Sequence, residues 1–253
     1  MKNSIFVITL LSFLLACQKN EDTQNVPKPA SSVDISVLKD KFHGTTAFNS
    51  TVSTSIEGIF LVIKTNGIPD HKSPYFGNSD SRFEVFNGIN PKFMLNPNSI
   101  KTQNFTFKIP LNPAEATSKR ATPLGPIGVS LNGVPFYNQF AGPSQPLTNE
   151  INSFDQYAGH PQMQGQYHYH IEPLYLTKNK GSDAFLGLLL DGFPIYGPKE
   201  NGTLVKESDL DAYHGHTAKT TEFPNGIYHY HITSTDPYLN GSGFFGTAGT
   251  VSQ

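Results

Sequence analysis

The segment Gly165-Gln-Tyr-His-Tyr-His-Ile171 returns almost unchanged as Gly226-Ile-Tyr-His-Tyr-His-Ile232. In each copy, tyrosine and histidine alternate with a period of two residues, which is typical of a β-strand. Successive side chains of a strand point to opposite faces, so the two histidines of a copy should share one face and the two tyrosines the other. The repeated segment therefore predicts two equivalent strands, each with two imidazoles side by side.

Two blocks upstream of these strands repeat as well, in the same order. Gly128-Val-Ser-Leu-Asn-Gly-Val-Pro-Phe-Tyr137 corresponds to Gly187-Leu-Leu-Leu-Asp-Gly-Phe-Pro-Ile-Tyr196, and Asp155-Gln-Tyr-Ala-Gly-His160 corresponds to Asp211-Ala-Tyr-His-Gly-His216. Only short length changes separate the two sets of blocks. We predict a structural repeat with copies at about 126–175 and 185–236, inside one pseudo-symmetric domain.

The composition favours a β-rich domain and excludes several classes of function. The chain has 19 Phe and 11 Tyr, which suit sheets, and 22 Gly and 19 Pro, which interrupt helices. Its net charge of −2 provides no basic surface, so we expect no nucleic-acid partner. The fold class that follows is mainly β: a sandwich-like single domain with minor short helices.

The same patterns place individual elements along the chain. Outside the repeat, strands are predicted at Gly58–Thr65, Arg82–Asn87 and Asn104–Pro110. Within the repeat, apolar strands should lie on either side of the Asn132-Gly133 and Asp191-Gly192 turns. Short helical turns are predicted at Asn149–Tyr157 and Glu207–Tyr213.

The N-terminus has the pattern of an export signal. Lys2 precedes an apolar run, Ile5–Leu15, which is too short to span a membrane and ends in Ala16-Cys17, as in a bacterial lipobox. We predict a signal peptide over 1–16, a lipidated Cys17, a flexible tether over 17–40 and a β domain over 41–253. The alternative is an ordinary signal peptide with an incidental cysteine. The lipobox predicts a membrane anchor in the cell envelope, at the outer membrane or the cell surface.

The combined motifs resemble the YHYH-domain family over roughly Thr65 to Gly246. The resemblance rests on the duplicated Gly-x-Tyr-His-Tyr-His, the two Leu-Asn/Asp-Gly-x-Pro-x-Tyr segments, Asn66-Gly-Ile-Pro-Asp-His71 and Asp236-Pro-Tyr-Leu-Asn-Gly241. The family consists of secreted or lipid-anchored bacterial proteins. The resemblance thus implies export but no particular reaction.

Six of the nine histidines occupy equivalent positions in the two copies, and we predict them as metal ligands. Two imidazoles at positions i and i+2 of a strand can converge on one ion, and the histidine of the Gly-His segment completes a set of three. Three imidazoles with an open position suit zinc or copper. The six candidate ligands are His160, His168, His170, His216, His229 and His231.

Other residues can support such a site. Asp155 and Asp211 are candidates for orienting an imidazole through its second ring nitrogen. Gly159 and Gly215 are expected to let the backbone turn sharply and present the next histidine. His71 is a possible extra ligand. His43 and His214 have no repeat partner and are expected at the surface.

The repeat leaves open whether each copy forms its own site, and we expect a shared or closely paired one. Three functions remain at this point. The first is a surface lipoprotein that binds copper or zinc. The second is a secreted enzyme that uses metal-bound water or Tyr/His acid–base chemistry. The third is a glycan- or protein-binding module in which the aromatic side chains pack against the glycan or partner and the histidines are structural.

Overall fold

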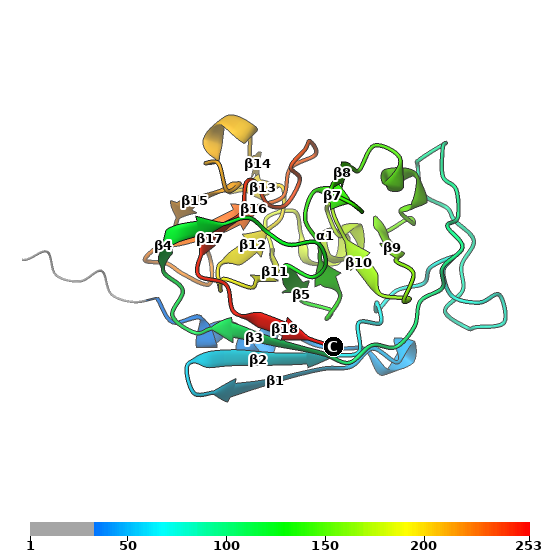
Figure 1. Ribbon diagram of the computed structural model, residues 1–253, viewed down its shortest axis with the longest axis horizontal. Helices are drawn as coiled ribbons and strands as arrows, with labels where there is room; N and C mark the ends of the chain where they lie inside the picture. Colours follow the sequence, from blue (N-terminus) through cyan, green and yellow to red (C-terminus); the bar gives the residue numbers. More distant parts are fainter. Residues whose placement is uncertain (1–32) are drawn as a thin grey trace, which may run out of the picture. The chain divides into compact units, whose positions relative to one another are not determined.

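The computed structural model describes residues 33–253, which belong to one compact unit built around two main sheets (Figure 1). One sheet has four strands and the other has eight, with two-stranded pairs beside them and little helix. The predicted mainly β fold is confirmed. The predicted signal peptide, Cys17 and most of the tether lie outside the described residues.

The four-stranded sheet is antiparallel, with the order β1-β2-β3-β18. Its strands are β1 (Val52–Glu57), β2 (Phe60–Thr65), β3 (Phe105–Pro110) and β18 (Thr250–Ser252). β3 matches the strand predicted at Asn104–Pro110. The strand predicted from Gly58 begins two residues later, because Gly58 has a φ of 62° and lies in the turn between β1 and β2.

The strand predicted at Arg82–Asn87 is wrong. The carboxylate of Asp80 accepts a hydrogen bond from the backbone N–H of Arg82 at 2.9 Å and forms an ion pair with its guanidinium at 2.6 Å. This local bonding holds the chain in a turn, and only Phe83 forms an isolated bridge, with Ser73. The segment Arg82–Asn87 thus belongs to an irregular loop.

The eight-stranded sheet has the order β15-β16-β12-β11-β5-β6-β10-β9. Its strands are β5 (Gly128–Ser130), β6 (Pro135–Phe136), β9 (Gly159–Pro161), β10 (Tyr167–Tyr169), β11 (Phe185–Leu189), β12 (Pro194–Tyr196), β15 (Gly215–Ala218) and β16 (Ile227–His231). From the centre of the sheet to one edge lie β5, β6, β10 and β9 of the first copy. From the centre to the other edge lie their equivalents in the second copy, β11, β12, β16 and β15. The antiparallel pairing of β11 with β5 at the centre provides the pseudo-two-fold relation that the repeat predicted.

The tyrosines of the two Tyr-His-Tyr-His strands contribute to the main core. Tyr167, Tyr169 and Tyr230 are fully buried and belong to the same apolar cluster as Phe105 and Phe107 of β3. Burying such large side chains contributes about 1.5–3 kcal/mol each. The tyrosines therefore fix the orientation of both strands, and the alternating histidines point to the other face of the sheet.

The remaining elements are short and lie in the connections. The helical elements are η1 (Ile35–Lys41), η2 (Thr46–Phe48), η3 (Glu150–Ser153), α1 (Leu174–Lys180) and η4 (Glu207–Asp209). The strand pairs are β4 (Glu115–Arg120) with β17 (Phe244–Gly246), β7 (Phe140–Ala141) with β8 (Gln145–Pro146), and β13 (Lys199–Glu200) with β14 (Thr203–Leu204). The helical turns predicted near η3 and η4 are present but shorter than expected.

The described part of the chain begins with the short helix η1. The tether predicted to extend to residue 40 ends earlier, because η1 packs Ile35 and Leu38 into the core with no exposed surface. Within residues 33–253, no helix is both long enough and apolar enough to cross a bilayer.

Candidate metal centres

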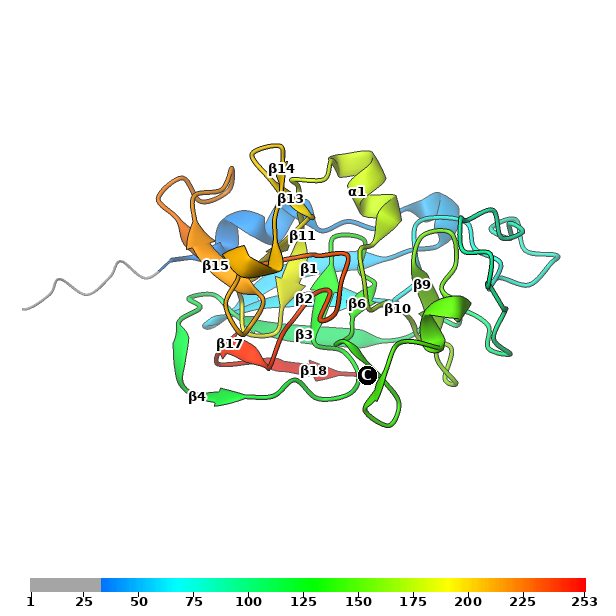
Figure 2. The same cartoon turned by 90° about the horizontal axis from the view of Figure 1, so that it is seen from above.

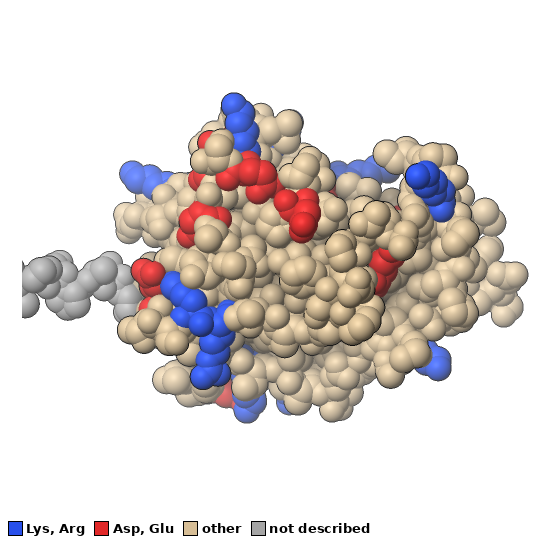
Figure 3. Space-filling view, turned by 45° about the horizontal axis from the view of Figure 1, so that its top comes forward, with Lys and Arg blue, Asp and Glu red and all other residues tan. Residues whose placement is uncertain are grey.

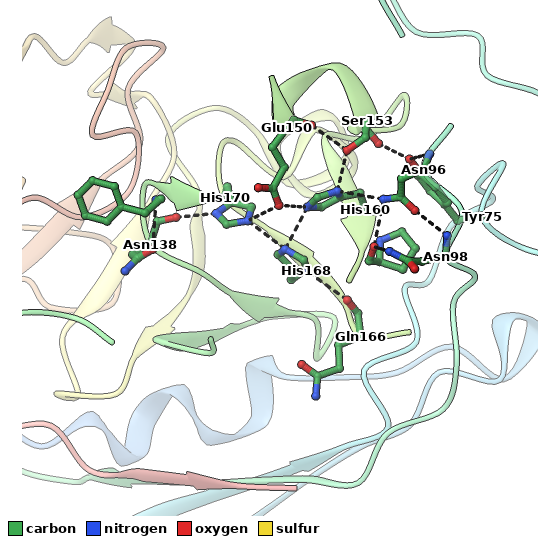
Figure 4. A network of polar contacts seen from close by, with 12 residues as sticks. Tyr75, Asn96, Asn98, Asn138, Glu150, Ser153, His160, Gln166, His168 and His170 are labelled. Carbon is green, nitrogen blue, oxygen red and sulfur yellow. Dashed lines mark hydrogen bonds and ion pairs between the residues drawn. The ribbon is translucent and has the colours of Figure 1, made fainter. Parts of the chain in front are cut away.

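The first histidine cluster forms where β9 and β10 pair at one end of the eight-stranded sheet (Figure 2). His168 lies in β10 and His170 directly follows the strand, so tyrosines and histidines alternate there. His160 of β9 lies directly opposite His168 in the antiparallel register. Glu150, the first residue of η3, extends its carboxylate toward the three rings (Figure 4). Sheet pairing thus brings together three residues that the sequence placed in two separate motifs.

The four ligand atoms of the first cluster, one from each of these residues, lie within 4.8 Å of one another. The Nε2 atom of His168 is 3.1 Å from that of His160 and 2.9 Å from that of His170. Oε1 of Glu150 lies 3.1 Å from Nε2 of His160 and 3.7 Å from Nε2 of His170. Ligands at zinc-bond length in a tetrahedron are about 3.3 Å apart, so these separations suit one ion at the centre.

Backbone carbonyls fix the protonation of the two β10 rings. The Nδ1–H of His168 donates to the carbonyl of Gln166 at 3.0 Å, and that of His170 donates to the carbonyl of Asn138 at 2.5 Å. A carbonyl only accepts, so the proton of each neutral ring belongs to Nδ1. Each Nε2 then carries an unshared electron pair, and the two pairs face each other.

His160 is held by side chains instead of carbonyls. The hydroxyl of Ser153 donates to the carbonyl of Glu150 at 2.7 Å and lies 2.8 Å from Nδ1 of His160. The amide of Asn96 lies 3.3 Å from Nδ1 and donates to the carbonyl of Pro161 at 3.1 Å. These contacts direct the Nε2 atom of His160 toward His168 and Glu150.

The centre of the first cluster is thus surrounded by three imidazole nitrogens and a carboxylate, and the Nε2 atoms of His168 and His170 both face it as acceptors. A proton on one ring would relieve the repulsion, but burial, together with the neighbouring histidines, lowers the pKa of His168 well below its usual range. Burial lowers the pKa of His170 to about 4. The Nε2 atoms of His168 and His170 therefore carry no proton near pH 7, and a bound cation would make the contact between them attractive.

The second cluster repeats this arrangement at the other end of the sheet. His229 and His231 alternate along β16, and His216 of β15 pairs with His229. The Nε2 atoms of His229 and His231 are 3.1 Å apart. Oε1 of Glu200, from β13, lies 3.5 Å from Nε2 of His216 and 3.6 Å from Nε2 of His229. All four ligand atoms again lie within 4.8 Å of one another.

The same tautomers follow in the second cluster. The Nδ1–H groups of His229 and His231 donate to the carbonyls of Ile227 and Gly197 at 3.0 and 2.9 Å. These carbonyls are the repeat equivalents of those of Gln166 and Asn138, which accept from the Nδ1–H groups in the first cluster. Burial lowers the pKa of His229 to about 3 and that of His231 to about 4. These two Nε2 atoms therefore also face each other as acceptors.

Two buried atoms of the second cluster have no hydrogen-bond partner. These are Oε1 of Glu200 and Nε2 of His216, and both belong to the four residues that could together hold a cation. A buried carboxylate oxygen without a partner costs free energy, which a metal ion at this position would offset. The donor set of both clusters, three imidazoles and one carboxylate, therefore fits zinc or copper on the chemistry of its atoms.

The glycines of the Gly-His segments act by close approach and not by turning the chain. A Cβ atom on Gly159 would overlap the ring of Tyr167, and one on Gly215 would overlap Tyr228. The residues with positive φ are the preceding ones, Ala158 at 66° and His214 at 72°. Glycine is required because the first tyrosine of each Tyr-His-Tyr-His strand covers the neighbouring strand at this point.

The predicted role of the two aspartates is wrong. Asp155 accepts hydrogen bonds from the hydroxyls of Tyr167 and Ser73 at 2.8 and 2.6 Å, and burial raises its pKa to about 6. Asp211 accepts one from the hydroxyl of Tyr228 at 2.9 Å. Both carboxylates lie on the tyrosine side of the sheet, so they fix the tyrosines while backbone carbonyls and Ser153 orient the imidazoles.

The structure also corrects the expectations for two other histidines. The Nε2 atom of His71 lies 3.1 Å from the hydroxyl of Tyr169, on the tyrosine face and outside both clusters. His214 is buried, not at the surface, and lies 3.4 Å from the carboxylate of Glu207 and 3.0 Å from the hydroxyl of Thr233. His43 is exposed, as predicted.

The expected shared site does not form. Four strands, β6, β5, β11 and β12, separate β10 from β16 in the sheet. At about 4.8 Å per strand, the two histidine strands are roughly 24 Å apart. Each copy therefore builds a separate cluster.

Sequence reasoning missed both carboxylates, because they come from different places in the two copies. The repeat equivalent of Glu150 is Glu207, since both begin the short helix before the aspartate block. Glu207 instead contacts His214, and the second cluster takes its carboxylate from Glu200 in β13. No signal in the repeat identified Glu200, because the equivalent position in β7 carries no acid.

Comparison with known proteins assigns the chain to a family. The model of the family described as "YHYH protein" matches residues 106–203 and 199–242, and the chain belongs to this family. The match covers every residue of both clusters. Neither the curated proteins nor the solved structures contain a match to the chain.

Proposed function

We propose that this protein is a lipoprotein of the cell envelope that binds two transition-metal ions, one in each copy of the repeat. The observation that carries the proposal is that each cluster points acceptors at a common centre. In the first cluster, the hydrogen bonds of His168 and His170 leave both Nε2 atoms without a proton. Those of His229 and His231 do the same in the second cluster. A network of structural histidines would pair donors with acceptors instead.

The donor set supports zinc(II) or copper(II). Imidazole and carboxylate suit both ions, whereas copper(I) prefers sulfur. The two methionines within residues 33–253, Met94 and Met163, are strongly exposed and belong to neither cluster. The clusters therefore present nitrogen and oxygen donors.

The membrane anchor rests on the lipobox at Cys17. On the face shown in Figure 3, charged side chains lie in small separate groups among uncharged ones, and the net charge is −2. The lipobox supports attachment through lipid at the outer membrane or cell surface, and the charge distribution favours a protein without a nucleic-acid partner. Cys17→Ser should abolish incorporation of labelled fatty acid and move the protein out of the membrane fraction. Retention of both would contradict the anchor.

Metal content of the untagged protein tests the main proposal. Elemental analysis after loading with zinc or copper and dialysis to remove unbound metal should give two ions per chain. The fourfold variant in which alanine replaces His168, His170, His229 and His231 should contain none. His43→Ala is the matched control, because this exposed histidine lies outside both clusters. Circular dichroism checks that the fourfold variant is folded. A parent protein that binds neither zinc nor copper would refute the proposal.

A further inference from the structure

The first cluster is enclosed by aromatic rings. The ring of Phe154 stacks on that of His170 with an interplanar angle of 3° and meets that of His160 edge-on at 4.7 Å. Tyr137 stacks on His168 at 3.9 Å. The side chains of the three histidines are at most 4% exposed, whereas that of Glu150 is 26% exposed. None of the three histidines lines any of the four main cavities of residues 33–253. One of these cavities, of about 1060 Å³, is lined by Phe154.

The second cluster lacks half of this cover. Tyr196 repeats Tyr137 and contacts His229 edge-on at 5.1 Å. The position equivalent to Phe154 is Leu210, however, because each precedes the aspartate of its block. The side chain of His216 is 24% exposed, against 4% for that of His160.

A small cavity opens directly onto the second cluster. His229, His231 and Glu200 form part of its wall, and its volume is about 130 Å³, or roughly four waters at ~30 Å³ each. A ligand in this cavity would therefore contact the metal position itself. The other three main cavities of residues 33–253 are not lined by the candidate ligands of the first cluster.

The charges around this cavity favour an anion. Lys199 and Lys219 line it, and neither forms an ion pair with any residue in the described part of the chain. Of the two acids in the wall, Glu200 faces the cation position and Asp183 accepts a hydrogen bond from the backbone N–H of Gly202 at 2.6 Å. Two ammonium groups and a bound divalent cation would give the cavity a net positive field.

We propose that the metal ion of the second cluster takes a small oxyanion, a carboxylate or a phosphate, as an additional ligand in the cavity flanked by Lys199 and Lys219, while the ion of the first cluster takes none. This inference rests on the proposed metal binding. Copper(II) favours tetragonal coordination, and zinc expands to five ligands, so an ion held by four protein atoms can accept one more.

Electron paramagnetic resonance of the copper(II)-loaded protein tests the inference, with inorganic phosphate and acetate as probes. In His168→Ala/His170→Ala, only the second cluster binds copper, and at least one of the two anions should shift its spectrum. In His229→Ala/His231→Ala, neither anion should shift the spectrum of the first cluster. In the parent, half of the signal should shift, which gives the same test if a double variant does not fold.

Lysine variants test the ligand class. Lys199→Gln/Lys219→Gln should raise the apparent Kd of the responding anion about tenfold, because two cationic partners are lost. Lys92→Gln/Lys101→Gln is the matched control, since both side chains are exposed and lie outside the cavity. A response to phosphate alone or acetate alone would support the inference and identify the oxyanion.

Three results would count against these proposals, and they are distinguishable. If both clusters bind copper but neither anion changes the second spectrum, the inference fails and metal binding stands. If anions shift both spectra equally, the contrast between enclosed and open clusters fails. If the folded His168→Ala/His170→Ala variant binds no copper or zinc, the proposed function fails for the second cluster.

Discussion

The two histidine clusters share their strand framework and differ in the loops that close it. In both, two rings from one strand and one from its neighbour converge, and carbonyls at equivalent positions, such as Asn138 and Gly197, accept from equivalent Nδ1–H groups. The carboxylate comes from η3 in one cluster and from β13 in the other, and only the first cluster has a phenylalanine cover. Sheet pairing thus preserves the imidazole geometry, whereas the connections vary the fourth ligand and the access to solvent.

The largest effect that we predict is a pH-dependent loss of stability in the metal-free protein. The folded pKa values of His170 and His231 are about 4, against about 6.5 in an unfolded chain, so the unfolded state binds more protons between these values. Stability should therefore fall as the pH drops from 6.5 to 4, by up to about 3 kcal/mol per imidazole.

The readout is denaturant unfolding of the chelator-treated protein at several pH values. Burial raises the pKa of Asp155 and of Asp191 to about 6, which acts in the opposite direction, so the parent must be compared with variants that retain both. His168→Ala/His170→Ala and His229→Ala/His231→Ala should each show a shallower pH dependence. Equal slopes in all three proteins would show that the rings are not buried as neutral imidazoles.

The next largest effect concerns the origin of the fourth ligand. Glu150→Gln and Glu200→Gln should each weaken zinc binding at one cluster by at least about 100-fold, because even outer partners of a metal site contribute 10–100-fold. Glu207→Gln is the matched control, since this residue is the repeat equivalent of Glu150 but contacts His214. Competition with a chelator measures both affinities. Loss of zinc in the control would show that the second cluster uses the sequence-equivalent acid.

A smaller effect should follow from filling the close contacts between strands. Gly159→Ala and Gly215→Ala introduce a methyl group against Tyr167 and Tyr228, and overpacking of this kind costs about 1–3 kcal/mol. Gly77→Ala is the control, because nothing lies within 4 Å of a Cβ atom there. Thermal unfolding provides the measurement. Unchanged stability at both positions would mean that the tyrosines can move aside.

The smallest predicted effect concerns access to the first cluster. Phe154→Leu copies the residue found at position 210 and should open the first cluster, with zinc transfer to a chelator faster by about tenfold. The loss of an aromatic cover worth about 1.4 kcal/mol would produce this factor. Zinc transfer from the second cluster in the same variant is the internal control. An unchanged rate at the first cluster would show that Phe154 does not limit the release of zinc.

Much of this arrangement could be predicted from the sequence, and its errors have a common cause. The period-two pattern placed His168 and His170 on one face, and the repeat correctly grouped them with His160. The expected shared site failed because copies related by a central two-fold place their outer strands at opposite ends of a sheet. The role given to Asp155 failed because the residue approaches the tyrosine face, and the linear sequence does not show this.

Alternation and duplication are local properties of the chain, so they already define the two Tyr-His-Tyr-His strands, the shared face of their histidines and the two equivalent sets of three histidines. The folded chain adds the acid that joins each set, the ring nitrogens that carry protons and the cluster that opens to solvent. These features depend on groups that meet through space, such as the carbonyl of Gly197 beside His231 or Glu200 beside His216, and their sequence separations follow no repeat.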